Sequence, residues 1–265
     1  MVIMTVRRIE MAYDDIGSGP ALILAHGYPF DRSMWREQID VLSAQGNRVV
    51  APDLRGMGET KATGEISTMA DMARDVAALM DRVEIERAVI CGLSMGGYVA
   101  FEFAKLFPAR LNGLVLAGTR APADNEQERQ ARFQQVEQML ANGMSGIAEA
   151  SPPKLLAPRT LAEKPEVVAR LHEMILQSDP QGAAAAQRGM AARRDYSDDL
   201  ASMNVPTLVM VGRDDPIRPV ADAEFMHDRI RDSRLEIIED AAHMTNMEQP
   251  EVFNAALLNF LHDLE

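Results

Sequence analysis

Ser94 lies in a Gly-x-Ser-x-Gly motif whose flanks are typical of a strand and a helix. The motif spans residues 92–96. A short β-branched run leads into it, and an apolar, helix-compatible stretch follows over 98–107. A sharp turn between a strand and a helix exposes the serine hydroxyl, whereas the five-residue pattern alone could mark an ordinary turn. The free N–H groups at the helix N-terminus suit a developing oxyanion. The motif in this context predicts that Ser94 is a nucleophile.

A serine nucleophile requires a base, because its hydroxyl group reacts poorly near neutral pH. His172, His227 and His262 lie within predicted helices. His26 lies in a loop beside the expected oxyanion donors, where we expect it to make structural hydrogen bonds. His243 is the only histidine in a loop after a late predicted strand. We therefore predict that His243 is the general base.

The base in turn needs an acid that orients its ring. With the chain order Ser, Asp, His, this acid follows an earlier strand, here the apolar run 207–211. Asp214 and Asp215 both follow that run, and the residues alone do not separate them. Asp240 and Asp53 are weaker candidates. Asp53 precedes the serine in the chain, and we interpret it as a turn residue.

Two backbone N–H groups are expected to form an oxyanion hole. One belongs to Met95, directly after the nucleophile, and the other to Tyr28, in the loop after an early strand. Loss of one such donor typically costs about 3 kcal/mol of transition-state stabilisation. We expect substrate contacts from Tyr28 and Met95, and also from Phe133, which belongs to an apolar stripe in the predicted helix 124–140.

Apolar runs alternate with amphipathic segments along most of the chain, and this alternation predicts a parallel sheet covered by helices on both faces. Thr68 is a plausible N-cap because Asp71 follows it by three residues. The candidate residues all follow predicted strands, at the edge of the sheet where ligand sites form. The expected strands are 5–16, 21–25, 48–51, 89–91, 114–117, 207–211 and 235–238, and the expected helices are 31–44, 67–83, 98–107, 221–230 and 250–261.

The alternation stops between residues 122 and 199, where we find no convincing strand. This stretch contains three segments of helical character separated by prolines. We therefore expect an α/β core made of residues 1–121 and 200–265, with residues 122–199 as a helical cap or lid.

Composition excludes several classes of partner. The chain has 265 residues, 47% of them hydrophobic, and a formal net charge of −13, which argues against nucleic acids and anionic membranes as partners. No apolar stretch is long enough to span a membrane, and the N-terminus lacks the pattern of a signal peptide, so we expect a cytoplasmic protein. Cys91 is the only cysteine, in an apolar run, so it is expected to be a buried, inert thiol.

The sequence favours chemistry without a cofactor. The histidines lack metal-ligand spacing, one cysteine cannot build a zinc cluster, and no Gly-x-Gly-x-x-Gly motif follows a strand. The expected partner is therefore a small-molecule ester, while the oligomeric state, a homo-oligomer included, stays open.

The chain resembles α/β-hydrolase fold enzymes from end to end. Within that fold it is similar to bacterial carboxylesterases, 3-oxoadipate enol-lactonase-like hydrolases and cofactor-free haloperoxidases (perhydrolases). The resemblance implies that Asp215 is the acid, since the family pattern is Gly-x-x-Asp, and that the helical insertion is a lid. Met57 departs from the histidine common in the family, whereas Pro29 is like the perhydrolase members. The matching segments are 26–29, 53–58, 92–97, 212–219 and 242–250.

These residues predict a serine hydrolase that cleaves carboxylic esters or lactones through an acyl-enzyme. The same triad would also serve hydrolysis of a carbon–carbon bond in a diketone from aromatic degradation, or formation of a peracid. A third possibility is a small-molecule receptor, which would react once without sustained turnover. Substrate specificity depends on the packing of the lid, which the sequence does not reveal.

Overall fold

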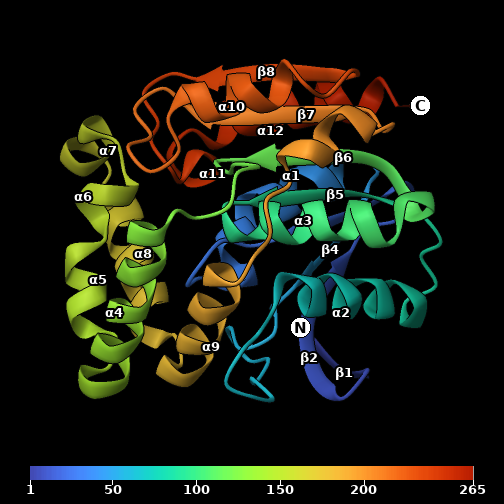
Figure 1. The fold of residues 1–265 in the computed structure, drawn as a ribbon. Coiled ribbons are helices and arrows are strands. Elements are labelled where there is room, and N and C mark those ends of the chain that lie inside the picture. Colours follow the sequence, from blue (N-terminus) through green and yellow to red (C-terminus); the bar gives the residue numbers. More distant parts are fainter. Residues whose placement is uncertain (265) are drawn as a thin grey trace.

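The computed structural model describes residues 1–264 and is built on one eight-stranded sheet (Figure 1). The strand order is β1-β2-β4-β3-β5-β6-β7-β8. The pairs β1–β2 and β2–β4 are antiparallel, and the other five pairs are parallel. The strands are β1 (Val2–Val6), β2 (Ile9–Ile16), β3 (Ala21–Ala25), β4 (Arg48–Pro52), β5 (Ala88–Leu93), β6 (Leu111–Ala117), β7 (Thr207–Gly212) and β8 (Ser233–Ile238). The predicted α/β-hydrolase architecture is confirmed.

Helices cover both faces of this sheet, which explains why the central strands β5 and β7 are apolar and fully buried along their length. Helix α1 packs against α12, and α2 packs against α3. The core helices are α1 (Arg36–Ala44), α2 (Met69–Arg82), α3 (Met95–Leu106), α10 (Val220–His227), α11 (Thr245–Glu248) and α12 (Pro250–His262). Thr68 caps α2 as expected, because its hydroxyl oxygen accepts the N–H of Asp71.

The first strands differ from the prediction of one extended segment over 5–16. The structure divides this stretch into the hairpin of β1 and β2, with the turn at Arg7 and Arg8. Arg7 adopts a φ of 56°, which arginine rarely does, so its residue type gave no signal of a turn. The expected helix 31–44 likewise begins as a 3₁₀ turn, η1 (Arg32–Trp35), before it continues as α1.

The chain between β6 and β7 is helical, and no strand interrupts it among the described residues. These helices gather beside the sheet, at the left of Figure 1. Prolines stand at the first position of the last four helices, where a fixed φ favours helix initiation, so they start the helices that they were expected to separate. The helices are α4 (Glu126–Asn142), α5 (Ser145–Ala150), α6 (Pro152–Leu155), α7 (Pro158–Glu163), α8 (Pro165–Gln177) and α9 (Pro180–Ala191).

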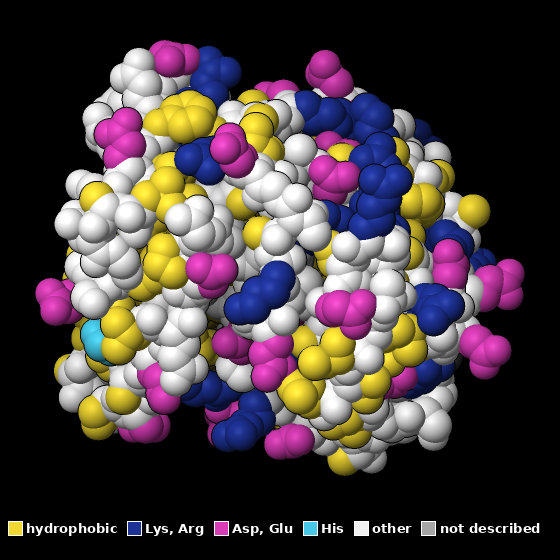
Figure 2. All heavy atoms as spheres, turned by 90° about the horizontal axis from the view of Figure 1, so that it is seen from below, with side chains coloured by type: hydrophobic (Ala, Val, Ile, Leu, Met, Phe, Trp, Pro, Cys, Tyr) yellow, Lys and Arg dark blue, Asp and Glu magenta, His cyan; other side chains and the backbone are white. Residues whose placement is uncertain are grey.

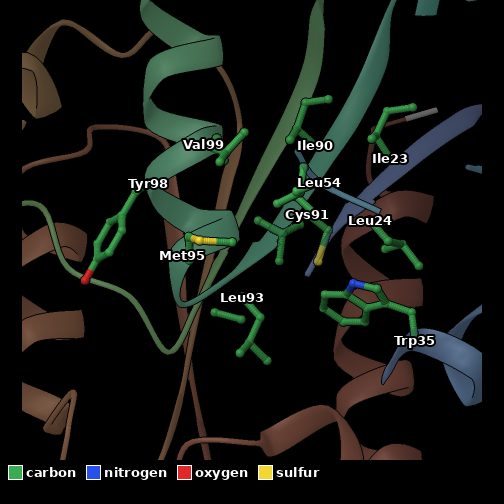
Figure 3. Close-up of a cluster of buried hydrophobic side chains, with 14 of the residues drawn as sticks. Ile23, Leu24, Trp35, Leu54, Ile90, Cys91, Leu93, Met95, Tyr98 and Val99 are labelled. Atoms are coloured by element: carbon green, nitrogen blue, oxygen red, sulfur yellow. The ribbon is translucent and has the colours of Figure 1, made fainter. Parts of the chain in front are cut away.

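Trp35 and Cys91 are fully buried in the core, which confirms the prediction made for Cys91 from its apolar run. Figure 3 shows both among the buried side chains next to the central strands. The ring of Trp35 lies 6.0 Å from that of Phe253 on α12. Burial raises the pKa of the Cys91 thiol, so the reactive thiolate is disfavoured. No helix within residues 1–264 is long and apolar enough to cross a membrane.

The surface carries charges of both signs. On the face drawn in Figure 2, Lys and Arg side chains are interspersed with Asp and Glu side chains. Many pair directly, as do Arg213 with Glu239 at 2.7 Å and Arg48 with Asp15 at 2.7 Å. Exposed pairs such as Arg213 with Glu239 contribute little to stability individually.

His26 joins the loops after β3 and β4. Its Nε2 accepts the N–H of Leu54 at 2.9 Å, so the ring proton resides on Nδ1, which lies 2.8 Å from the carbonyl oxygen of Gly27. Burial lowers the pKa of His26, which keeps the ring neutral and this tautomer in place. Asp53 supports the second loop by accepting the N–H groups of Arg32 and Glu59. His26 therefore has the structural role expected of it.

The buried, neutral His26 predicts a pH dependence of stability. The unfolded chain binds a proton at His26 as pH falls through about 6.5, whereas the folded chain resists it until a lower pH. This contribution to stability is therefore complete above that pH and is lost as pH falls below it. Urea unfolding between about pH 7.5 and 5.5 should show a steeper loss of stability in the wild type than in His26→Gln, by up to ~1.4 kcal/mol per pH unit. Equal slopes would contradict the assignment.

Candidate active site

Ser94 occupies a tight backbone turn between β5 and α3. Its φ is 55° and its ψ is −111°, a conformation that serine rarely adopts. Two hydrogen bonds hold the turn from the neighbouring strand β6 and the loop after it. The N–H of Ser94 donates to Ala117 at 2.8 Å, and the hydroxyl of Thr119 donates to the Ser94 carbonyl at 3.0 Å. The serine is thus fixed at the carboxyl end of the central strand.

Gly92 and Gly96 allow the backbone segments around this turn to touch. A Cβ atom on Gly92 would lie 2.1 Å from the carbonyl oxygen of Gly96. A Cβ atom on Gly96 would lie 2.0 Å from the carbonyl oxygen of Ala25 at the end of β3. Both contacts are with backbone, which cannot move aside cheaply, so the glycines of the motif are required for packing.

Ser94 and His243 line one cavity of about 480 Å³. Core loops supply one side of it, including Tyr28 and Pro29. The helices between β6 and β7 supply the other side, with residues from α4, α5, α6 and α9. The cavity therefore lies between the helical insertion and the sheet, where a lid was expected.

His243 is oriented by Asp215. The His243 Nδ1 and the Asp215 Oδ2 lie 2.8 Å apart, and both side chains are buried. The other carboxylate oxygen accepts the N–H groups of Ile217 at 2.8 Å and Arg218 at 2.9 Å. Asp214 is exposed and makes no such contact. The geometry thus separates the two aspartates that the residues alone did not, and it leaves Nε2 of His243 free for the cavity.

The expected oxyanion donors are the N–H groups of Met95 and Tyr28. Met95 is the first residue of α3, so its N–H has no acceptor within the helix. Its side chain is buried in the core, as Figure 3 shows, and does not line the cavity. Tyr28 follows β3 and lines the cavity directly. Met95 would therefore contact a substrate only through its backbone.

Phe133, which we expected to contact the substrate, does not lie at the cavity. Its side chain is 48% exposed and does not line the cavity. Helix α4 instead faces the cavity with Arg132, Gln135 and Asn142, which recur at helical spacing. Phe133 is one position beyond Arg132, so its side chain points about 100° away from that face. The apolar stripe suggested by the sequence is thus only partly buried.

Glu248 is a buried residue of the site that the sequence analysis did not single out. Its carboxylate accepts the N–H of Ala157 at 2.6 Å, the hydroxyl of Thr160 at 2.7 Å and the N–H of Ala242 at 2.8 Å. Burial raises its pKa, although these donors oppose the shift. Because Ala157 and Thr160 belong to the helical insertion and Ala242 precedes His243, Glu248 ties the insertion to the loop of the base.

No group of three potential metal ligands is assembled within residues 1–264. The polar side chains at the cavity belong mostly to arginine, glutamine and tyrosine, which do not form a typical metal site.

Comparison with known proteins agrees with this architecture. The family model described as the alpha/beta hydrolase fold matches residues 20–250. The chain is 32% identical to 3-oxoadipate enol-lactonase 2 of Acinetobacter baylyi, over 96% of this chain and 94% of that one. Among solved structures, a thermophilic esterase from Thermogutta terrifontis is 40% identical with a TM-score of 0.96, covering 99% and 98% of the two chains. The enol-lactonase from Burkholderia xenovorans LB400 is 27% identical with a TM-score of 0.91, covering 98% and 100%. The chain belongs to the alpha/beta hydrolase fold family.

Proposed function

We propose that the protein hydrolyses carboxylic esters, lactones included, through an acyl-enzyme formed on Ser94. The observation that carries this proposal is that Ser94 and His243 line the same cavity, and that His243 is hydrogen-bonded to the buried carboxylate of Asp215. The relatives named as an esterase and as enol-lactonases support the same reaction class.

The proposed cycle begins when Nε2 of His243 accepts the proton of the Ser94 hydroxyl as its oxygen attacks the ester carbonyl. The N–H groups of Tyr28 and Met95 stabilise the negative charge on the carbonyl oxygen. Asp215 holds the ring orientation and stabilises the imidazolium. His243 then protonates the leaving alcohol, which leaves an acyl group on Ser94. Water, deprotonated by His243, attacks this acyl group and releases the acid.

Perhydrolysis is a second candidate. Pro29 lines the cavity next to Tyr28, and a non-heme haloperoxidase of Rhodococcus erythropolis is 30% identical over 95% of this chain. In this reaction hydrogen peroxide replaces water as the attacking group, so the acyl-enzyme releases a peracid and regenerates the serine. Both reactions pass through the same acyl-enzyme and differ only in its acceptor.

The first prediction concerns Ser94 itself. The wild type should hydrolyse p-nitrophenyl esters with sustained turnover, and Ser94→Ala should lower the rate by several powers of ten, since the nucleophile is lost. A series of acyl lengths, followed by release of p-nitrophenolate, would also size the cavity. A release of one equivalent that then stops would indicate a receptor or an unsuitable acyl group. Unchanged turnover in Ser94→Ala would contradict the proposal.

The second prediction separates the adjacent aspartates. Asp215→Asn should lower kcat on the order of ten-thousandfold, because an amide at that position favours the wrong tautomer of His243. Asp214→Asn makes the same chemical change on an exposed neighbour and should leave kcat within about twofold of the wild type. Measuring kcat for both variants with one p-nitrophenyl ester tests the assignment. Similar rates for the two variants would show that Asp215 is not the acid.

A further inference from the structure

Arg218 is a buried cation without an acidic partner in the cavity. Its side chain lines the cavity together with Ser94 and His243, although the residue is only 8% exposed. One terminal nitrogen donates to the Tyr98 hydroxyl at 2.8 Å, and the other donates to the Ile217 carbonyl at 2.6 Å. No carboxylate within residues 1–264 lies within ion-pair distance of it. Because a guanidinium has five N–H donors, Arg218 keeps donors in excess of its two partners.

The ion pairs formed by the neighbouring arginines do not include Arg218. Three further arginines lie around Tyr98 and the cavity wall, and they share two acids. Asp124 pairs with Arg120 at 2.9 Å, with Arg193 at 3.0 Å and also with Arg132, while Glu128 pairs with Arg120 at 2.7 Å. Asp195 interacts electrostatically with Arg193, and the partly buried Asp222 interacts with Arg218 and Arg120, in each case without a direct ion pair. Among the described residues, Arg218 is therefore the one guanidinium group of the four that has no direct ion pair.

The pKa of Tyr98 is lowered by the positive charges along this wall. Its ring lies under the guanidinium of Arg193, 4.2 Å from the ring centroid, and the residue lines the cavity. Burial alone would raise the pKa of the phenol, but the charges of Arg218, Arg193 and Arg132 outweigh burial and lower it. The Tyr98 oxygen accepts from Arg218, so its own proton remains available as a donor.

We propose that this wall is a carboxylate subsite, and that the natural substrate is an ester or lactone that carries a second, ionised carboxyl group. The proposal deepens the proposed function and rests on it. A buried guanidinium without an acid is costly, and a bound carboxylate would offset that cost. The planar fork of Arg218 and the hydroxyl of Tyr98 match the two oxygens of such a group. Arg132, which also lines the cavity, adds attraction at longer range.

Matched pairs of esters test the charge requirement. Monoethyl esters of dicarboxylic acids with two to four methylene groups carry a terminal carboxylate, and the corresponding terminal amides are neutral and of similar shape. Acetate esters of ω-hydroxy acids and of their amides place the charge in the alcohol part. For the best length we expect kcat/KM to be about tenfold or more higher for the charged member. Added NaCl should reduce this preference. Equal kcat/KM values in every pair would overturn the proposal.

Arg218→Gln tests whether Arg218 is the residue that recognises the substrate carboxylate. In this variant the ratio of kcat/KM for the charged substrate to kcat/KM for the neutral substrate should be about tenfold lower than in the wild type. Arg213→Gln is the matched control, because Arg213 lies on the same loop, is exposed and pairs with Glu239 instead of the cavity. That control should keep the wild-type ratio. An unchanged ratio in Arg218→Gln would overturn the role of Arg218. If that variant fails to fold, the wild-type pairs still decide the substrate class.

The same data distinguish failure of this inference from failure of the proposed function. Sustained hydrolysis of the neutral members without any preference for the charged members would reject the carboxylate subsite alone. Absence of sustained hydrolysis for every ester would reject the proposed function. The subsite can then be tested separately by calorimetric titration of glutarate into Ser94→Ala, where salt-sensitive binding supports it and no binding overturns it.

Discussion

The close contact between the backbone at Ser94 and the end of β3 is the constraint on which the site depends. Strand β5 must turn into α3 within one residue, and Ser94 takes a positive φ to do so. The first turn of α3 then lies so close to β3 that only a glycine fits at position 96. This contact places the first turn of α3, which begins at Met95, against the end of the strand that leads into the loop of Tyr28. A side chain at Gly96 would separate the two expected oxyanion donors.

His243 and Asp215 come from the other half of the chain and are brought to the Ser94 side by the parallel order of the sheet. Strands β6, β7 and β8 lie in sequence beyond β5, so the loops after β7 and β8 end near one another. Asp215 lies in the first of these loops and His243 in the second. The His243 loop is also held from the opposite side, because the N–H of His243 donates to the Leu155 carbonyl at 3.1 Å. With Glu248, this bond makes the helical insertion part of the support of the base.

The sequence predicted those parts of the protein where local chemistry and fold agree. The glycines around Ser94 indicate a tight turn between a strand and a helix, and the apolar runs indicate buried strands. Asp215 was distinguished from Asp214 only through the family resemblance, because the distinction depends on which carboxylate turns inward. The hairpin at Arg7 was missed since a positive φ at arginine has no sequence signal. Phe133 was misplaced because amphipathic spacing did not reveal which face of α4 meets α9. The charge on the cavity wall arises from Arg120, Arg132, Arg193 and Arg218, which only the fold brings together around Tyr98.

The central claim is that Ser94 carries the acyl group, and a stoichiometric suicide reagent tests it most directly. A p-nitrophenyl alkylphosphonate should be attacked at phosphorus by the Ser94 oxygen with release of p-nitrophenolate. Mass spectrometry of the digested protein should then find one phosphonyl group per chain, on the peptide that contains Ser94. Loss of esterase activity should follow the extent of labelling, and Ser94→Ala should take up no label. Full labelling of Ser94 with esterase activity retained, or inactivation with the label on another residue, would contradict the account.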